Sequence, residues 1–141
     1  MKMKFLILSK LLHSGSYQLF SGYIVFSLSI LIILFKFHTF WQYSLVIIAI
    51  LLVAIHHYVA LRVKLDAELL EYLSKAEDAQ QLEQLTQELD QSLVTLKLMP
   101  EQRTGRSWDL RLKGCQKLFK WQISLLVLQF VYLIIVLVPM F

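Results

Sequence analysis

The sequence predicts an all-α integral membrane protein with three transmembrane helices and a cytoplasmic α-helical hairpin between the second and the third. Three stretches, residues 11–35, 37–61 and 121–141, contain no Asp, Glu, Lys or Arg. Each exceeds the roughly 20 apolar residues that cross the hydrocarbon of a bilayer. All ten acidic residues lie between the second and third stretches, from Asp66 to Asp109. A water-soluble chain of 141 residues, 57% of them hydrophobic, could not bury three such helices on all sides, which indicates a polytopic membrane protein.

Residues 1–16 are predicted to form an interfacial segment on the membrane surface. Over residues 3–13, lysines are interspersed with large apolar residues, which is typical of a helix lying among lipid headgroups. Lys10 interrupts the apolar run and no small-x-small motif follows, so the segment does not resemble a removable signal peptide. A frayed tail is the alternative. In the interfacial interpretation, five side chains dip into lipid: Phe5, Leu6, Leu8, Leu11 and Leu12.

The three spans are predicted at residues 17–35, 40–60 and 121–141. Only residues 36–39 separate the first two, so these spans form a tight transmembrane hairpin over residues 17–60. Aromatic side chains near span ends favour the membrane–water interface. The residues in such positions are Trp41, Tyr43, Tyr58 and Trp121.

The distribution of Lys and Arg predicts that the N-terminus is cytoplasmic and the C-terminus is on the opposite side. Three lysines precede the first span, ten Lys and Arg residues lie in 61–120, one lysine lies in the short turn and none follows the third span. Positively charged segments stay in the cytoplasm. The expected location is a bacterial inner (cytoplasmic) membrane, with residues 61–120 in the cytoplasm.

Residues 61–120 are predicted to form two antiparallel helices, 61–98 and 107–120, joined by a loop over 99–106. Their charges are complementary, with a net charge of −4 over residues 61–99 and +4 over residues 101–120. Leucines three or four residues apart along the first helix indicate a coiled-coil-like apolar face. The expected interface residues are Leu65, Leu69, Leu73, Leu82, Leu85, Leu89, Leu93 and Leu96.

A bend near Ser74 is an alternative to one straight helix over residues 61–98. Ser74-Lys75-Ala76-Glu77 matches a capping box, in which a serine caps a new helix and a glutamate reaches back to it. The bend would also let the short return helix close the hairpin.

The basic residues that flank the second and third spans favour contact with lipid headgroups over nucleic-acid binding. A basic residue close to an anionic membrane surface gains about 1 kcal/mol. The predicted headgroup contacts are Arg62, Lys64, Arg111, Lys113, Lys117 and Lys120.

Three polar residues within the spans are candidates for a site. His56 and His57 are adjacent, so on a helix they point about 100° apart and cannot hold one metal ion together. We interpret them as the polar rim of the second span, with binding of a haem or quinone as the weaker alternative. Gln129 lies near mid-membrane, and we expect its amide to bond to another helix, an interaction worth about 0.6–2 kcal/mol.

These features favour a non-enzymatic accessory, scaffolding or regulatory subunit without a cofactor. The sequence contains no P-loop, zinc-type Cys/His cluster or G-x-S-x-G motif, and no charged residue within the spans to move ions. The expected partners are membrane lipids and either a larger membrane complex or further copies of the chain. Two alternatives stay open: an oligomeric pore-forming or holin-like protein, and a haem- or quinone-associated subunit that uses His56 and His57.

Overall fold

A computed structural model describes residues 1–36 and 40–138 and shows no strand among them. Three continuous helical stretches, Lys2–Lys36, Phe40–Ser74 and Trp108–Leu137, are long and apolar enough to cross a membrane. The prediction of an all-helical protein with three such helices is therefore confirmed. The elements are α1 (Lys2–His13), α2 (Gly15–Lys36), α3 (Phe40–Ser74), α4 (Ala79–Thr95), a 3-10 turn η1 (Glu101–Arg103) and α5 (Trp108–Leu137).

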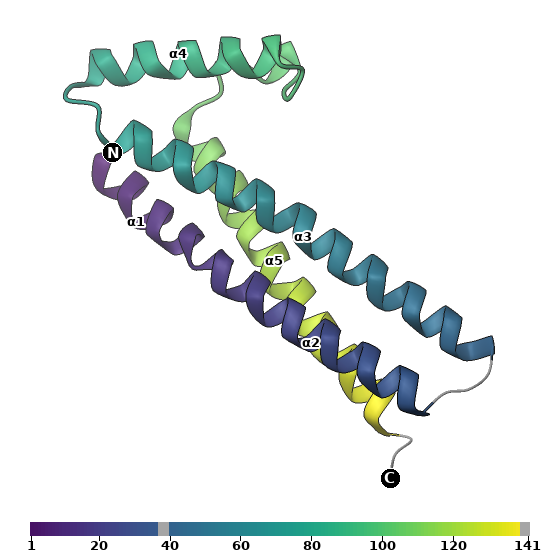
Figure 1. The fold of residues 1–141 in the computed structure, drawn as a ribbon. Coiled ribbons are helices and arrows are strands. Elements are labelled where there is room, and N and C mark those ends of the chain that lie inside the picture. The colour runs from purple at the N-terminus through teal and green to yellow at the C-terminus, as the bar shows by residue number, and fades with distance from the viewer. Residues whose placement is uncertain (37–39, 139–141) are drawn as a thin grey trace.

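Three long rods make up the molecule, and a fourth helix lies across one end of them. The first rod is α1 followed by α2, and it lies alongside α3 and α5 (Figure 1). Helices α2 and α5 run in the same direction and α3 runs in the opposite one. The N-terminus lies at the end covered by α4, and the C-terminal end of α5 lies at the other (Figure 1).

Buried residues seven positions apart form the centre of the bundle. This spacing is typical of helices that pack in a left-handed supercoil, in membranes as in water. Several of the positions are small or polar, which allows close approach and interhelical hydrogen bonds. They are Gly15, Gly22 and Ser29 on α2, Ala49, His56, Val63 and Leu70 on α3, and Gln122, Gln129 and Val136 on α5.

The expectation that residues 1–16 form an interfacial helix with five apolar side chains in lipid is wrong for three of those side chains. Phe5, Leu8 and Leu12 are buried in a cluster with residues of α3 and α5. Leu6 and Leu11 are exposed. The reason is that Ser14 between α1 and α2 keeps right-handed helical dihedral angles, so α1 extends the first rod and meets α3 instead of turning onto the membrane surface.

The single helix expected over residues 61–98 is also wrong, because the chain breaks at residues 75–78. Asp78 caps α4 by accepting a hydrogen bond from the Gln81 backbone N–H at 2.7 Å, and Gln81 Oε1 accepts one from the Glu77 N–H at 2.6 Å. This reciprocal capping lies four residues beyond the alternative placed at Ser74, whose hydroxyl instead donates to the Glu71 carbonyl. At its other end, α4 stops at Thr95 and Lys97 adopts a left-handed conformation with φ 57°.

The rods are longer than a bilayer is thick. Residues 40–60 of α3 span roughly 31 Å at about 1.5 Å per residue, which matches the hydrocarbon thickness. The rest of α3, residues 61–74, extends roughly 21 Å further. Together with α1 and residues 108–120, residues 61–74 form what we call the charged end of the bundle. This end has an apolar core of its own, in which Phe5, Leu8 and Leu12 pack against residues of α3 and α5.

Phe5 offers a test of how α1 packs. Its ring centroid lies 4.7 Å from that of Trp108, and such aromatic pairs contribute about 0.5–1.5 kcal/mol beyond burial. We expect Phe5→Leu to lower the free energy of unfolding by about 1 kcal/mol, measured by SDS titration in mixed micelles. The control is Ile7→Leu, since Ile7 is 62% exposed. Equal stability of the two variants would contradict the packing of α1 on the bundle.

Candidate functional site

His56 and Gln129 connect α3 to α5 inside the bundle. His56 is fully buried, and its Nδ1 lies 2.9 Å from Gln129 Oε1. Because a carbonyl oxygen only accepts, the histidine Nδ1 donates, and Nε2 of the neutral ring is then an acceptor. Gly22 of α2 leaves room for this pair, since a Cβ at Gly22 would lie 2.7 Å from His56 Nδ1 and 2.9 Å from Gln129 Oε1. A glycine is needed here because the three helices meet at this point.

The same arrangement recurs one heptad nearer the charged end. Gln122 Nε2 donates to the Gly15 carbonyl at 2.8 Å, and a Cβ at Gly15 would lie 2.7 Å from Gln122 Oε1. Two glycines of α2 thus face two glutamines of α5, with His56 joining the second pair. We call these five residues the polar seam. Sequence reasoning singled out Gln129 for a bond to another helix, but its interpretation of His56 as the polar rim of the second span is wrong, because this side chain is fully buried and bonded to Gln129 of α5. Gly15, Gly22 and Gln122 were missed, although the seven-residue spacing between the two glycines and between the two glutamines was a signal for them.

His57 points to a different helix from His56. Its Nδ1 lies 2.6 Å from Tyr23 Oη of α2, near the surface of the bundle. The two histidines therefore diverge, as expected for neighbours on a helix. Within residues 1–36 and 40–138, no three His, Cys, Asp or Glu side chains lie close enough to hold a metal ion.

The hydroxyl groups in the spans bond mainly to backbone carbonyls. Ser21, Ser27 and Ser29 each donate to the carbonyl four residues earlier on α2. Tyr132 of α5 reaches across to the Leu45 carbonyl of α3 at 2.6 Å. Of the three serines only Ser29 is buried in the bundle, so they do not line a common polar channel.

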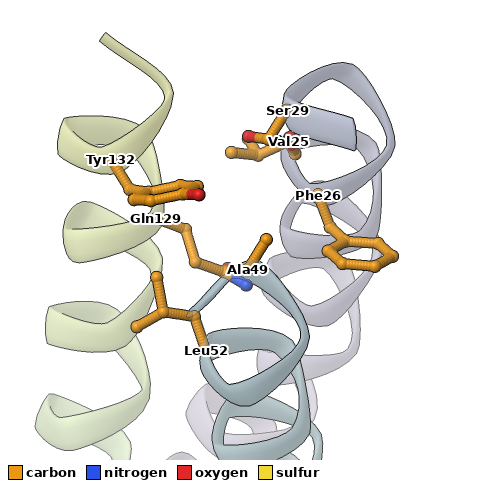
Figure 2. Close-up of a pocket in the computed structure, with 7 residues that line it drawn as sticks. All are labelled: Val25, Phe26, Ser29, Ala49, Leu52, Gln129 and Tyr132. Carbon is orange, nitrogen blue, oxygen red and sulfur yellow. Dashed lines mark hydrogen bonds between the residues drawn. The ribbon is translucent and has the colours of Figure 1, made fainter. Parts of the chain in front are cut away.

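A small cavity lies beside Gln129, between α2, α3 and α5. Its volume is about 10 Å³. Figure 2 shows Gln129 and Tyr132 of α5 on one side of it, with Ser29 and Val25 of α2 opposite them. The full lining is Val25, Phe26, Ser29, Ala49, Leu52, Gln129 and Tyr132.

A part-buried ion pair fixes α4 to the start of α5. Arg111 Nη1 and Nη2 donate to Asp90 Oδ1 and Oδ2 at 2.6 and 2.7 Å. The side chains of Arg111 and Asp90 are only 12% and 9% exposed. Asp90 also accepts a hydrogen bond from the Gly105 backbone N–H at 3.1 Å, so the same carboxylate orders the loop that leads to α5. Two parallel hydrogen bonds of this kind give a strong and directional contact.

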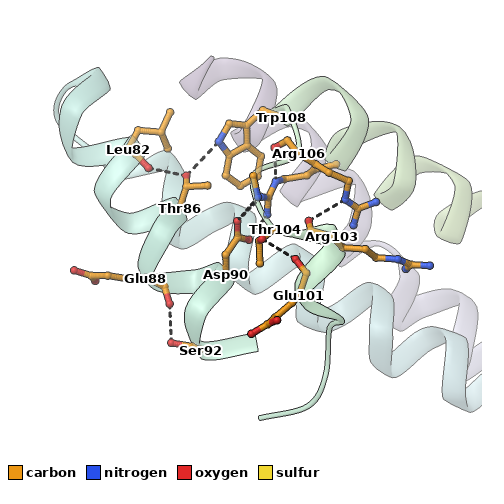
Figure 3. Close-up of polar contacts among 12 residues, drawn as sticks. Leu82, Thr86, Glu88, Asp90, Ser92, Glu101, Arg103, Thr104, Arg106 and Trp108 are labelled. Atoms are coloured by element: carbon orange, nitrogen blue, oxygen red, sulfur yellow. Dashed lines mark hydrogen bonds and ion pairs between the residues drawn. The ribbon is translucent and has the colours of Figure 1, made fainter. Parts of the chain in front are cut away.

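Trp108 adds a second attachment between α4 and the bundle. Its indole N–H donates to Thr86 Oγ1 of α4 at 3.2 Å (Figure 3), and its ring also packs on Phe5. The Arg111 guanidinium lies 5.1 Å from the centroid of the same ring, within the range of a cation–π contact. We call Thr86, Asp90, Trp108 and Arg111 the α4 clamp.

The α4 clamp places Arg111 differently from the headgroup contact that was expected of it. Its guanidinium is bound to Asp90 at the end of the bundle farthest from the uncharged spans, so it is not free to bind lipid. The other five residues of that prediction are exposed: Arg62, Lys64, Lys113, Lys117 and Lys120. Their contact with lipid stays a prediction.

The leucines expected at a helix–helix interface divide into two groups. Leu73 is buried in the core cluster, and Leu69, Leu82, Leu85, Leu89 and Leu93 are half-buried. Leu65 and Leu96 are 45% and 66% exposed. Most of this apolar face is therefore used within the chain, and α4 is the element that carries an exposed leucine at its end.

The ion pair predicts how the attachment of α4 depends on pH. The Arg111 hydrogen bonds hold the pKa of the Asp90 carboxyl below its ordinary value, so the pair stabilises docking above that ordinary value, near 4. This contribution is lost as the pH falls through the lowered pKa. We expect hydrogen exchange in α4, corrected for the intrinsic pH dependence, to accelerate below about pH 4. The variant Asp90→Asn should lack this transition, and its persistence there would assign it to another carboxylate.

Fold and site together define an all-helical protein with three helices able to cross a membrane, a buried polar seam and a clamped helix at one end. No family model, characterised protein or solved structure shows significant similarity to the chain.

Proposed function

We propose that the protein is a non-enzymatic subunit of a membrane complex that presents α4 to a partner protein in the cytoplasm. The observation that carries this proposal is the fixed position of α4 at the charged end, with two exposed leucines directly after its last residue, Thr95. Leu96 and Leu98 are 66% and 59% exposed, although this end of the bundle has a buried core of its own. Exposed apolar side chains in an aqueous segment are typical of a contact surface when they are adjacent.

The charges around these leucines indicate the kind of partner. Residues 77–101 contain six acidic residues and one basic residue, Lys97. Asp90 is used by the α4 clamp, whereas Glu83 and Glu88 are exposed on the outer face of α4. Opposite charges on two surfaces raise the rate of association and select the partner. A protein with an apolar groove bordered by Lys or Arg fits this surface.

The polar seam supports a structural role for the spans in this proposal. His56, Gln122 and Gln129 bond to other helices of the same chain, and the cavity beside Gln129 has a volume of only about 10 Å³. The bundle would then act as a rigid anchor that holds α4 roughly 20 Å from the membrane surface. In the orientation that the distribution of Lys and Arg predicts, the N-terminus is cytoplasmic and the C-terminus faces the opposite side.

Co-purification in mild detergent tests the proposal. Tagged protein should recover a defined protein, identified by mass spectrometry, and the double variant Leu96→Gln with Leu98→Gln should reduce its recovery roughly tenfold, as for loss of a contact worth about 1.4 kcal/mol. Tyr72→Gln is the matched control, because Tyr72 is 62% exposed on α3, away from this end of α4. Recovery of no partner, or equal recovery with the double variant, would contradict the proposal.

A further inference from the structure

The cavity beside Gln129 is the size of one water molecule. Its volume of about 10 Å³ is close to the minimum that a bound water needs, provided that the site also offers two to four polar partners. The cavity lies between residues predicted to be within the membrane, where bulk water does not compete for those partners. Whether the cavity holds a water molecule therefore depends on the hydrogen bonds that its wall residues can donate and accept.

Three polar side chains of the wall still have hydrogen-bonding capacity. Gln129 Oε1 accepts from His56, which leaves the Gln129 amide NH₂ as a donor group. Ser29 donates its hydroxyl hydrogen to the Val25 carbonyl, and Tyr132 donates its own to the Leu45 carbonyl. Each hydroxyl oxygen nevertheless keeps lone pairs that can accept. One donor group and two acceptors are complementary to a water molecule that accepts one hydrogen bond and donates two.

We propose that this cavity binds one water molecule, held by Gln129, Ser29 and Tyr132. A polar group in an apolar environment is costly unless it is hydrogen-bonded, and the water supplies a partner for the Gln129 amide. All three side chains line the cavity, and Figure 2 shows Tyr132 and Ser29 on opposite sides of it with the amide end of Gln129 beside Ala49. The water would connect Ser29 of α2 to α5, while Gln129 connects α5 to His56 of α3. All three spans would then be joined through one amide group.

The neighbouring part of the polar seam supplies independent support for internal hydration. His56 Nε2 and Gln122 Oε1 have no hydrogen-bond partner within the described chain, and both residues are fully buried. Native proteins pair the large majority of such buried polar atoms with protein groups or with ordered water. The interior of the bundle therefore contains two further acceptors, His56 Nε2 and Gln122 Oε1, that ordered water would satisfy.

Solid-state NMR of the full-length protein in lipid bilayers tests this site directly. With ¹⁵N-labelled glutamine, we expect magnetisation to pass from water to the Gln129 side-chain amide, and faster than to the backbone amide of Val25 in a ¹⁵N-valine sample. The exposed Gln91 side chain of α4 serves as the positive reference. Transfer to Gln129 no faster than to Val25 would show that the cavity is dry and would overturn the proposal.

Two matched variants locate the water. Ser29→Ala removes one wall acceptor and should slow the transfer to Gln129 by roughly twofold or more, since a bound water needs its polar partners. Ser27→Ala removes the same type of bond to a preceding carbonyl, but Ser27 is exposed on the other side of α2, so the transfer should not change. Equal rates in both variants and the wild type would place any water elsewhere and contradict the assignment.

Discussion

Replacement of Gly22 by leucine is expected to separate α2 from α3 and α5. A Cβ alone would lie 2.7 Å from His56 Nδ1, 2.8 Å from His56 Cε1 and 2.9 Å from Gln129 Oε1. The imidazole ring is rigid and fully buried, so it cannot move aside without breaking its bond to Gln129. We expect the free energy of unfolding to fall by about 3 kcal/mol, the upper part of the usual range for an overfilled interior. SDS titration followed by circular dichroism measures this change.

Gly15 and Gly114 provide controls of the same chemistry for this prediction. Gly15→Leu should cost less, because the three atoms nearest to its Cβ position all belong to the flexible end of Gln122. Gly114→Leu should be neutral or slightly stabilising, since nothing lies within 4 Å of its Cβ position and leucine favours a helix over glycine by up to about 1 kcal/mol. If the Gly22 and Gly114 variants are equally stable, the close approach of the three helices at Gly22 is wrong.

Removal of the Asp90 charge is expected to release α4 from the bundle while the three rods stay packed. In Asp90→Asn, the Arg111 guanidinium loses its charged partner at a position where only 12% of its side chain is exposed. Breaking a buried ion pair from one side costs about 3–5 kcal/mol. At about 3 kcal/mol, the local opening of α4 becomes roughly a hundredfold more frequent. Hydrogen exchange resolved by mass spectrometry should show this acceleration in residues 79–95.

The control for this prediction is Glu83→Gln on the same helix. Glu83 is exposed and takes no part in the α4 clamp, so exchange in α4 should stay at the wild-type rate. Residues 17–35 should remain protected in both variants, because their packing does not involve Asp90. Unchanged exchange in Asp90→Asn would show that Trp108 and the apolar face of α4 hold this helix without the ion pair.

The long elements could be predicted because their signals are local. Each of the three charge-free stretches is long enough to cross a bilayer, and they correspond to α2, α3 and α5. The break between α3 and α4 depends on a finer balance. Ser74 and Asp78 both offer a capping oxygen, and Asp78 forms the cap with Gln81 acting in return.

The candidate site was less predictable because it depends on pairing between distant parts of the chain. Gln129 requires a hydrogen-bonding partner wherever it lies, but the choice of His56 follows from the register of α3 against α5. Similarly, Arg111 was predicted to contact headgroups because it is a basic residue near a span. Its pairing with Asp90 arises only because α4 lies over the end of the bundle. Phe5 and its neighbours looked interfacial because the extension of α3 that covers them is not visible in their own segment.

Site-specific photocrosslinking in intact cells tests most directly whether α4 presents its end to a partner. A photoreactive phenylalanine analogue is placed at Leu98, which is 59% exposed, and separately at Ile47, which is 57% exposed on the uncharged part of α3. The account predicts an adduct from position 98 with the same protein that co-purifies, and no such adduct from position 47. An adduct of twice the chain's mass would mean that position 98 contacts a second copy of this chain. That result, or adducts from position 98 that contain only lipid, would contradict the account.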